Sequence, residues 1–255
     1  MINYTKQKML KGQKTIGTFF ELGTANAVEG LGYSGLDYII IDTEHGPYGE
    51  ESAMEFIRAA KLSKLSPFAR IKEVSRAAVL RMLDIGAEGL IVPYVKTVDE
   101  VKALVKYGKY APVGERGFFY GRAAGYGFED FAKNLDEYTD KCNYETMIIP
   151  QCETSGCLEN IEEIASIDGV DGIFVGPYDL SIALGIPGQF NSDILINALD
   201  RIVKACKKAG KFTFIFANDT ESASKNFEMG FDSVAISTDI AVLVNAYRNI
   251  VKTIK

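Results

Sequence analysis

Side chains that can transfer protons or bind a cation occur at four places in the chain, each at or directly after the end of a short apolar run. These places are Asp42-Thr43-Glu44-His45, Arg70, Gln151-Cys152-Glu153 and Gly176-Pro177-Tyr178-Asp179. His45 is the only histidine in the sequence, and the four cysteines show no CxxC spacing. A zinc site built on two or three imidazoles is therefore excluded within one chain.

The carboxylates of Glu153 and Asp179 form the candidate metal site. Without further imidazole or thiolate ligands, this set is hard and rich in oxygen, which suits Mg²⁺ or Mn²⁺, with Co²⁺ as an alternative. A 2-oxo acid such as pyruvate can chelate an ion of this kind through one carboxylate oxygen and its keto oxygen. The ion then stabilises the enolate that forms when a bond to C3 breaks.

The remaining candidates could complete this chemistry. Arg70 can place a second positive charge against the developing oxyanion. His45 can move a proton, because imidazole titrates near neutral pH, and Asp42 could orient it. Gln151 could form a hydrogen bond with the keto oxygen or with a metal-bound water. The amides of the turn formed by Gly176, Pro177, Tyr178 and Asp179, at a helix start, could bind the substrate carboxylate.

Each candidate also has an ordinary structural explanation when it is taken alone. Asp179 or Glu153 could cap a helix, Arg70 could form an ion pair, and His45 could lie on a surface loop. Their placement after four different strands favours the catalytic interpretation.

Eight β-branched or aromatic runs alternate with longer amphipathic segments, and several runs are apolar almost throughout. This pattern indicates parallel strands covered by helices, and it favours a closed (β/α)8 TIM barrel over the alternative, an open doubly wound sheet. The carboxyl ends of barrel strands converge on one mouth, where the candidates would meet. The runs are Thr15–Phe20, Asp37–Asp42, Pro67–Ile71, Glu88–Val92, Glu145–Gln151, Asp171–Gly176, Lys211–Phe216 and Asp232–Ser237.

We expect residues 1–255 to form a single domain with two unusual segments. The connection between the fourth and fifth strands, Pro93 to Tyr144, spans about fifty residues, and its glycine-rich part, Gly114–Phe128, is expected to be a lid or an interface element. A capping box at Thr97–Glu100 opens a helix in this connection. The last helix, Asp239–Ile254, is apolar around much of its circumference. It should pack either deeply on its own barrel or against another subunit.

Composition excludes several functional classes. Hydrophobic residues make up 47% of the chain, charged residues 24%, and the net charge is −6. This charge argues against nucleic acid as a partner, since binding it requires a concentration of Lys and Arg. No apolar run reaches the roughly 20 residues that cross a bilayer. The start of the chain has no apolar signal region. We expect a cytoplasmic protein with reduced thiols and no membrane partner.

In order and spacing, five motifs resemble the HpcH/HpaI aldolase family of class II pyruvate aldolases, over nearly the whole chain. The motifs are Asp42-x-Glu44-His45-Gly46, Arg70, Gly114-x-Arg116-Gly117, Gln151-x-Glu153-Thr154 and Gly172-Ile173-Phe174-Val175-Gly176-Pro177-x-Asp179-Leu180-Ser181.

The resemblance implies that Glu153 and Asp179 bind the metal and that His45, supported by Asp42, transfers protons. It implies that Arg70 and Gln151 contact the pyruvyl group. It also implies a (β/α)8 barrel whose last helix is exchanged within a dimer, commonly in a hexameric trimer of dimers. The altered loop at Gln189–Ser192 and the aromatic segment Phe118–Arg122 leave the aldehyde partner open.

The resulting expectation is an enzyme that reversibly cleaves a 4-hydroxy-2-oxo acid to pyruvate and an aldehyde. Decarboxylation of oxaloacetate at the same site is an alternative, since it passes through the same enolate. A Schiff-base mechanism would use Lys72 or Lys96, which lie near strand ends. A scaffold that only binds a 2-oxo acid is the non-enzymatic alternative.

Overall fold

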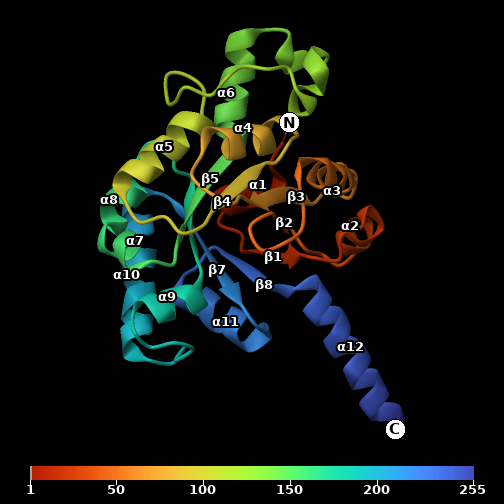
Figure 1. Cartoon of the computed structure of the whole chain (residues 1–255), viewed down its shortest axis with the longest axis vertical. Coiled ribbons are helices and arrows are strands. Elements are labelled where there is room, and N and C mark those ends of the chain that lie inside the picture. Colours follow the sequence, from red (N-terminus) through yellow and green to blue (C-terminus); the bar gives the residue numbers. More distant parts are fainter. Residues whose placement is uncertain (1) are drawn as a thin grey trace.

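The computed structural model describes residues 2–255, and within them eight parallel strands close into a barrel in sequence order (Figure 1). Strand β8 pairs with β1, so the open-sheet alternative is wrong. All eight predicted runs form strands, with ends shifted by at most two residues. The strands are β1 (Thr15–Phe20), β2 (Tyr38–Asp42), β3 (Ser66–Arg70), β4 (Gly89–Val92), β5 (Met147–Cys152), β6 (Gly172–Val175), β7 (Phe212–Ala217) and β8 (Ser233–Thr238).

Helices connect the strands and surround the barrel, as the (β/α)8 prediction requires (Figure 1). They are α1 (Tyr4–Leu10), α2 (Ala25–Gly32), α3 (Glu50–Leu62), α4 (Arg76–Asp84), α5 (Val98–Gly108), the 3₁₀ turns η1 (Arg122–Gly127) and η2 (Asp130–Ala132), α6 (Leu135–Glu145), α7 (Ser155–Glu159), α8 (Ile161–Ser166), α9 (Pro177–Ala183), α10 (Asp193–Ala209), α11 (Thr220–Met229) and α12 (Asp239–Ile254).

The apolar strand sequences are buried on both faces. In β2, Tyr38 and Ile40 point into the barrel, where Tyr38 stacks on Phe68 at 4.9 Å between ring centroids. Ile39 and Ile41 alternate with them and pack beneath the helices. Because side chains fill the barrel interior, a ligand can reach the strands only at the ends of the barrel.

The long connection between β4 and β5 contains α5, the two 3₁₀ turns and α6. The predicted capping box is confirmed, since Thr97 and Glu100 exchange hydrogen bonds at the start of α5. The glycine-rich segment lies near the amino-terminal end of the barrel, because Arg116 forms a 2.9 Å ion pair with Asp84 at the end of α4. Its expected role as a lid over the mouth of its own barrel is therefore wrong.

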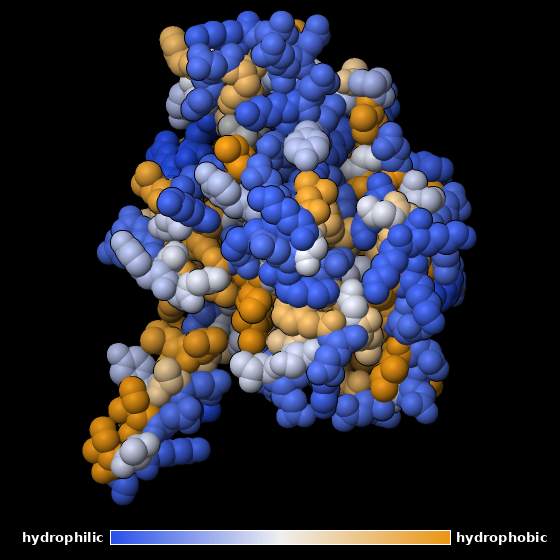
Figure 2. Space-filling view, turned by 180° about the vertical axis from the view of Figure 1, so that it is seen from behind, coloured by the Kyte–Doolittle hydropathy of each residue, from blue (hydrophilic) through white to orange (hydrophobic). Residues whose placement is uncertain are grey.

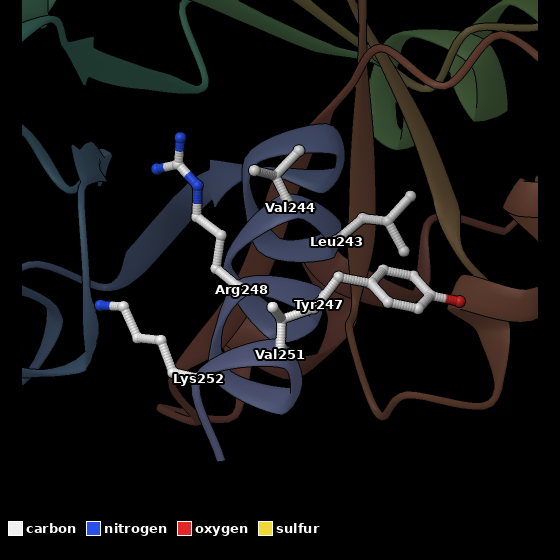
Figure 3. Close-up of a pocket in the computed structure, with 6 residues that line it drawn as sticks. All are labelled: Leu243, Val244, Tyr247, Arg248, Val251 and Lys252. Atoms are coloured by element: carbon white, nitrogen blue, oxygen red, sulfur yellow. The ribbon is translucent and has the colours of Figure 1, made fainter. Parts of the chain in front are cut away.

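Helix α12 begins and ends at the predicted residues but projects away from the barrel (Figure 1). The expectation that it packs deeply on its own barrel is wrong, since Val242 is 54% exposed and Tyr247 is 62% exposed. Apolar atoms gather on this projecting helix (Figure 2). Leu243, Val244, Tyr247 and Val251 lie along one side of it, with Arg248 and Lys252 on another (Figure 3).

In the part of the chain that the structure describes, no helix combines the length and apolarity needed to cross a membrane.

Candidate active site

Strands β2 and β3 place a buried ion pair at the carboxyl end of the barrel. Asp42 and Arg70 are partners in the strand register, and the guanidinium donates to both carboxylate oxygens of Asp42, at 2.9 and 2.6 Å. Glu44 lies 3.3 Å from Arg70 Nε, and the Phe19 ring lies beneath the guanidinium. Burial disfavours the charged guanidinium, but the hydrogen bonds and charge of Asp42 raise the pKa of Arg70. The site therefore holds a permanent, rigidly oriented cation.

Strand β5 carries Glu153 into a buried position directly after its last residue. Glu153 Oε1 accepts a 2.6 Å hydrogen bond from the Tyr94 N–H, and Oε2 accepts one from Gln151 Nε2. Burial, opposed by the Tyr94 hydrogen bond and reinforced by the charges of Asp179 and Glu44, raises the pKa of Glu153 to about 7. The ionised form of Glu153 is therefore disfavoured in the folded protein, and a neighbouring cation would stabilise it.

Gly176 allows the end of β6 to lie close to the end of β5. A methyl group on Gly176 would lie 2.7 Å from Glu153 Oε2 and 2.8 Å from Gln151 Nε2, so any side chain here would displace the acid. Asp179 follows three residues later, in the first turn of α9, and lines the same cavity as Gln151 and Arg70. The predicted residues of β3, β5 and β6 are thus brought together at one mouth.

The ordinary explanation for the two acids, helix capping, is wrong. Gly176 is the N-cap of α9, and Asp179 makes no side-chain capping bond. The Thr154 side chain caps α7 in place of Glu153.

The donor set fits a divalent cation. Gln151 Oε1 is buried without a hydrogen-bond partner within residues 2–255, so the site contains an unused acceptor beside the acids. Over the same residues, no group of three or more His, Cys, Asp or Glu side chains could hold a metal ion. Two carboxylates, with the other positions left to water and substrate, are a common arrangement for Mg²⁺. Glu153 and Asp179 are the residues that could hold the ion.

His45 lies on the loop after β2, with its side chain 73% exposed and Nε2 3.8 Å from Glu44 Oε2. The expected contact between Asp42 and the imidazole does not occur in the described residues. The carboxylate of Asp42 is occupied by Arg70, and its Oδ1 also accepts the N–H groups of Glu44, at 3.1 Å, and His45, at 3.4 Å. Asp42 therefore orients the loop backbone and Arg70.

The mouth cavity has a volume of about 150 Å³. This lies below the roughly 300–1,000 Å³ of pockets for drug-sized ligands, so the site suits small molecules. Among the predicted residues, Asp42, His45 and Glu153 do not line it directly. Its walls are formed by Phe19, Glu21, Arg70, Gln151, Phe174, Gly176, Pro177, Tyr178, Asp179, Phe216 and Thr238.

Five of these wall residues were missed by the sequence analysis, namely Phe19, Glu21, Phe174, Phe216 and Thr238. All five lie in or directly after strands β1, β6, β7 and β8. The rule that active-site residues follow strand ends would have named most of them, had it been applied to every strand.

Comparisons with known proteins identify the family of this chain. The family model for HpcH/HpaI aldolase/citrate lyase matches residues 15–246. A hydroxypyruvate/pyruvate aldolase from Roseobacter denitrificans is 32% identical over 98% of this chain and 96% of its own. A 2-keto-3-deoxy-L-rhamnonate aldolase from Klebsiella pneumoniae is 30% identical over 96% and 90%.

A solved structure also supports membership of this family. The HpcH/HpaI aldolase from Desulfitobacterium hafniense superimposes with a TM-score of 0.91 and 33% identity, over 98% of this chain and 96% of that one. Its barrel is therefore closely similar throughout. The chain belongs to the HpcH/HpaI aldolase/citrate lyase family and is a carbon–carbon lyase.

Proposed function

We propose that this enzyme is a divalent-metal-dependent aldolase that reversibly cleaves a 4-hydroxy-2-oxo acid to pyruvate and an aldehyde. The observation that carries the proposal is the buried acid Glu153, whose pKa is raised to about 7, with Asp179 and the cation Arg70 at the same mouth. The relatives named pyruvate aldolase and 2-keto-3-deoxy-L-rhamnonate aldolase support this substrate class.

Each side chain of the site has a separate role in the proposed reaction. A divalent ion held by Glu153 and Asp179 would supply a Lewis acid that stabilises the enolate charge. Arg70, fixed by two hydrogen bonds from its guanidinium to Asp42, holds a second positive charge in the same cavity. The free Oε1 of Gln151 can accept a hydrogen bond from a bound hydroxyl or water. His45 Nε2, beside Glu44, can hold or release a proton at the loop.

Metal removal and restoration test this function. We expect EDTA to abolish both aldol cleavage and the exchange of pyruvate methyl protons in D₂O, and Mg²⁺ or Mn²⁺ to restore both. Co²⁺ is a further ion to compare. Glu153→Ala should not respond to added metal, whereas Glu163→Ala, which removes an exposed acid far from the mouth, should respond like the wild type. Full activity in a metal-free preparation would contradict the proposal.

The structure gives less support to the other mechanisms. Within residues 2–255 no lysine lines the mouth cavity, and Lys96 Nζ lies 4.1 Å above the Tyr94 ring. Borohydride trapping of a pyruvate adduct on Lys72 or Lys96 would favour a Schiff-base mechanism. Oxaloacetate decarboxylation needs the same residues as the aldol reaction, so the two are separated by comparing turnover of oxaloacetate with that of a 4-hydroxy-2-oxo acid.

We also infer that the enzyme is a homo-oligomer built on exchange of α12 between subunits, in a dimer or a hexamer of three dimers. The exposed apolar side of α12 supports this, because isolated surface helices rarely expose such a stripe. Leu243→Asp combined with Val251→Asp should shift the mass in analytical ultracentrifugation towards the monomer. Asn245→Asp on the same helix should leave the mass unchanged.

The single domain spanning residues 1–255 and the cytoplasmic location stay predictions from the sequence.

A further inference from the structure

Glu21 lies directly after β1 with its main chain firmly held. Its N–H donates a 2.8 Å hydrogen bond to Asp239 Oδ1, and the next N–H, of Leu22, donates to Asp239 Oδ2 at 3.1 Å. Its carbonyl accepts a hydrogen bond from the Tyr48 hydroxyl. The Glu21 side chain lines the mouth cavity, and in the described chain it has no hydrogen bond or ion pair of its own. A fixed backbone thus presents a free carboxylate to the cavity.

The position of Glu21 in the barrel places it across the mouth from the proposed metal ligands. In the closed order of the strands, β1 lies four strands from β5, which leads into Glu153. A 2-oxo acid bound near Glu153 and Asp179 would therefore direct the remote end of its reaction partner towards β1 and β8, where Glu21 and Thr238 lie.

The charges around this part of the cavity are mostly negative. Within residues 2–255, Arg70 is the only cation that lines the cavity, and it is already paired with Asp42 and Glu44. Burial raises the pKa of Glu21, and the charges of Asp239 and Asp42 raise it further against the opposing effect of Arg70. The negative charge of Glu21 is therefore not neutralised by the groups that would hold the 2-oxo acid.

We propose that Glu21 determines the class of aldehyde that the enzyme accepts, an inference that rests on the proposed aldolase function. Its carboxylate accepts hydrogen bonds from the hydroxyl groups of a short neutral hydroxyaldehyde, and it repels aldehydes that carry a carboxylate at the far end. Thr238, Phe19 and Phe216 also line the cavity, and together they supply a hydroxyl group and apolar surface that suit a hydroxylated carbon chain. Selectivity then arises from an unfavourable contact with the wrong partner as well as from a favourable contact with the right one.

The test measures kcat/KM for aldol addition of pyruvate to D-glyceraldehyde, which is neutral, and to succinate semialdehyde, which is anionic. Glu21→Gln removes the charge with little change of shape. We expect the ratio of succinate semialdehyde to glyceraldehyde to rise by about tenfold or more, the effect of one like charge at partly screened contact distance. The rise should shrink as ionic strength increases.

Two further variants separate this effect from general ones. Glu73→Gln removes an exposed acid from the loop after β3, at the same end of the barrel but outside the cavity, and should keep the wild-type ratio. Glu21→Asp keeps the charge and should keep the ratio within about threefold, which also provides a folded variant if Glu21→Gln is unstable. An unchanged ratio in Glu21→Gln, or an equal rise in Glu73→Gln, would overturn the proposal.

Failure of the aldolase function itself is recognised separately. Exchange of pyruvate methyl protons in D₂O needs no aldehyde, so its absence in the metal-loaded wild type would refute the proposed function. Exchange in the wild type together with an unchanged aldehyde ratio in Glu21→Gln would refute only the selectivity of Glu21.

Discussion

Both ends of the barrel contain buried charged side chains, but the acid Asp171 at one end is paired with cations of the chain, whereas the acid Glu153 at the other end forms no ion pair within residues 2–255. At the amino-terminal end, Asp171 accepts from Lys6 and Lys109, each at 2.8 Å, and from the Ile148 N–H. At the carboxyl-terminal end, Glu153 accepts from a main-chain amide and from Gln151, while Asp179 and Glu44 repel its charge.

This difference distinguishes charged side chains that hold the fold together from charged side chains that are available to a ligand. The cluster around Asp171 satisfies its charges within the chain, so it ties α1 and α5 to the start of β6. At the mouth, Arg70 is paired with Asp42 and Glu44, and within residues 2–255 neither Glu153 nor Asp179 forms an ion pair, an arrangement that costs stability until a ligand supplies positive charge. Burial of a charged residue alone would not have distinguished these two ends.

Removal of Glu153 at the mouth is the most direct test of this difference between the two ends of the barrel. Glu153→Ala should lower kcat/KM for aldol cleavage on the order of 10³-fold, because the variant would lack a ligand of the proposed metal ion. Its free energy of unfolding should fall by less than that of a variant that breaks a buried ion pair, since two hydrogen bonds but no ion pair are lost. Steady-state kinetics and calorimetry measure the two effects, and a stability loss without a kinetic one would reverse the assignment of this end.

The reciprocal change at the other end is Lys109→Met. The variant leaves Asp171 with Lys6 alone, and we expect the free energy of unfolding to fall by about 3 kcal/mol. The metal-loaded enzyme should keep its kcat/KM at temperatures where it is folded. Lys204→Met, which removes an exposed helix pair, serves as the control and should change stability by less than about 0.5 kcal/mol.

Arg70→Lys tests whether the guanidinium of Arg70 acts through its geometry. A lysine keeps the charge but cannot donate the two parallel hydrogen bonds to Asp42. We expect kcat/KM to fall about 10²-fold, with most of the loss in kcat, because the charge near the oxyanion is no longer fixed. A loss confined to KM would indicate a role in binding alone.

The smallest expected effect concerns pH. The pKa of Glu153 is about 7 in the folded protein and near 4.5 when unfolded, so the folded state binds more protons between these values. The contribution of this group to the stability of the metal-free protein is therefore complete below pH 4.5 and decreases as pH rises to about 7. Between pH 5 and 8, the free energy of unfolding should fall with pH by about 2 kcal/mol less in Glu153→Gln than in the wild type. Chemical denaturation of the metal-free proteins at several pH values measures this difference. An identical dependence of the free energy of unfolding on pH in the variant would argue against a raised pKa of Glu153.

Sequence pattern predicted the features that depend on local order. The strands, the Thr97 capping box and the bounds of α12 follow from apolar periodicity and helix-start residues, which act within a few positions. The metal-site candidates followed from the rule that barrel strands end at one mouth.

Pairings between distant segments could not be predicted in this way. The choice of Arg70 over His45 as the partner of Asp42 depends on the register of β2 and β3, which brings the two side chains face to face. The location of the glycine-rich segment depends on the ion pair between Arg116 and Asp84, 32 positions apart. Both outcomes need the three-dimensional arrangement, since neither leaves a periodic signal in the chain.

Asp239 links the projecting helix to the rim of the mouth cavity. It is the first residue of α12, and its carboxylate also anchors the main chain of Glu21 and Leu22 beside the cavity. A neighbouring molecule that fixes the direction of this helix would therefore also hold in place the main chain of Glu21, the residue proposed to select the aldehyde. Substrate preference should then vary with protein concentration, becoming less strict as the enzyme is diluted.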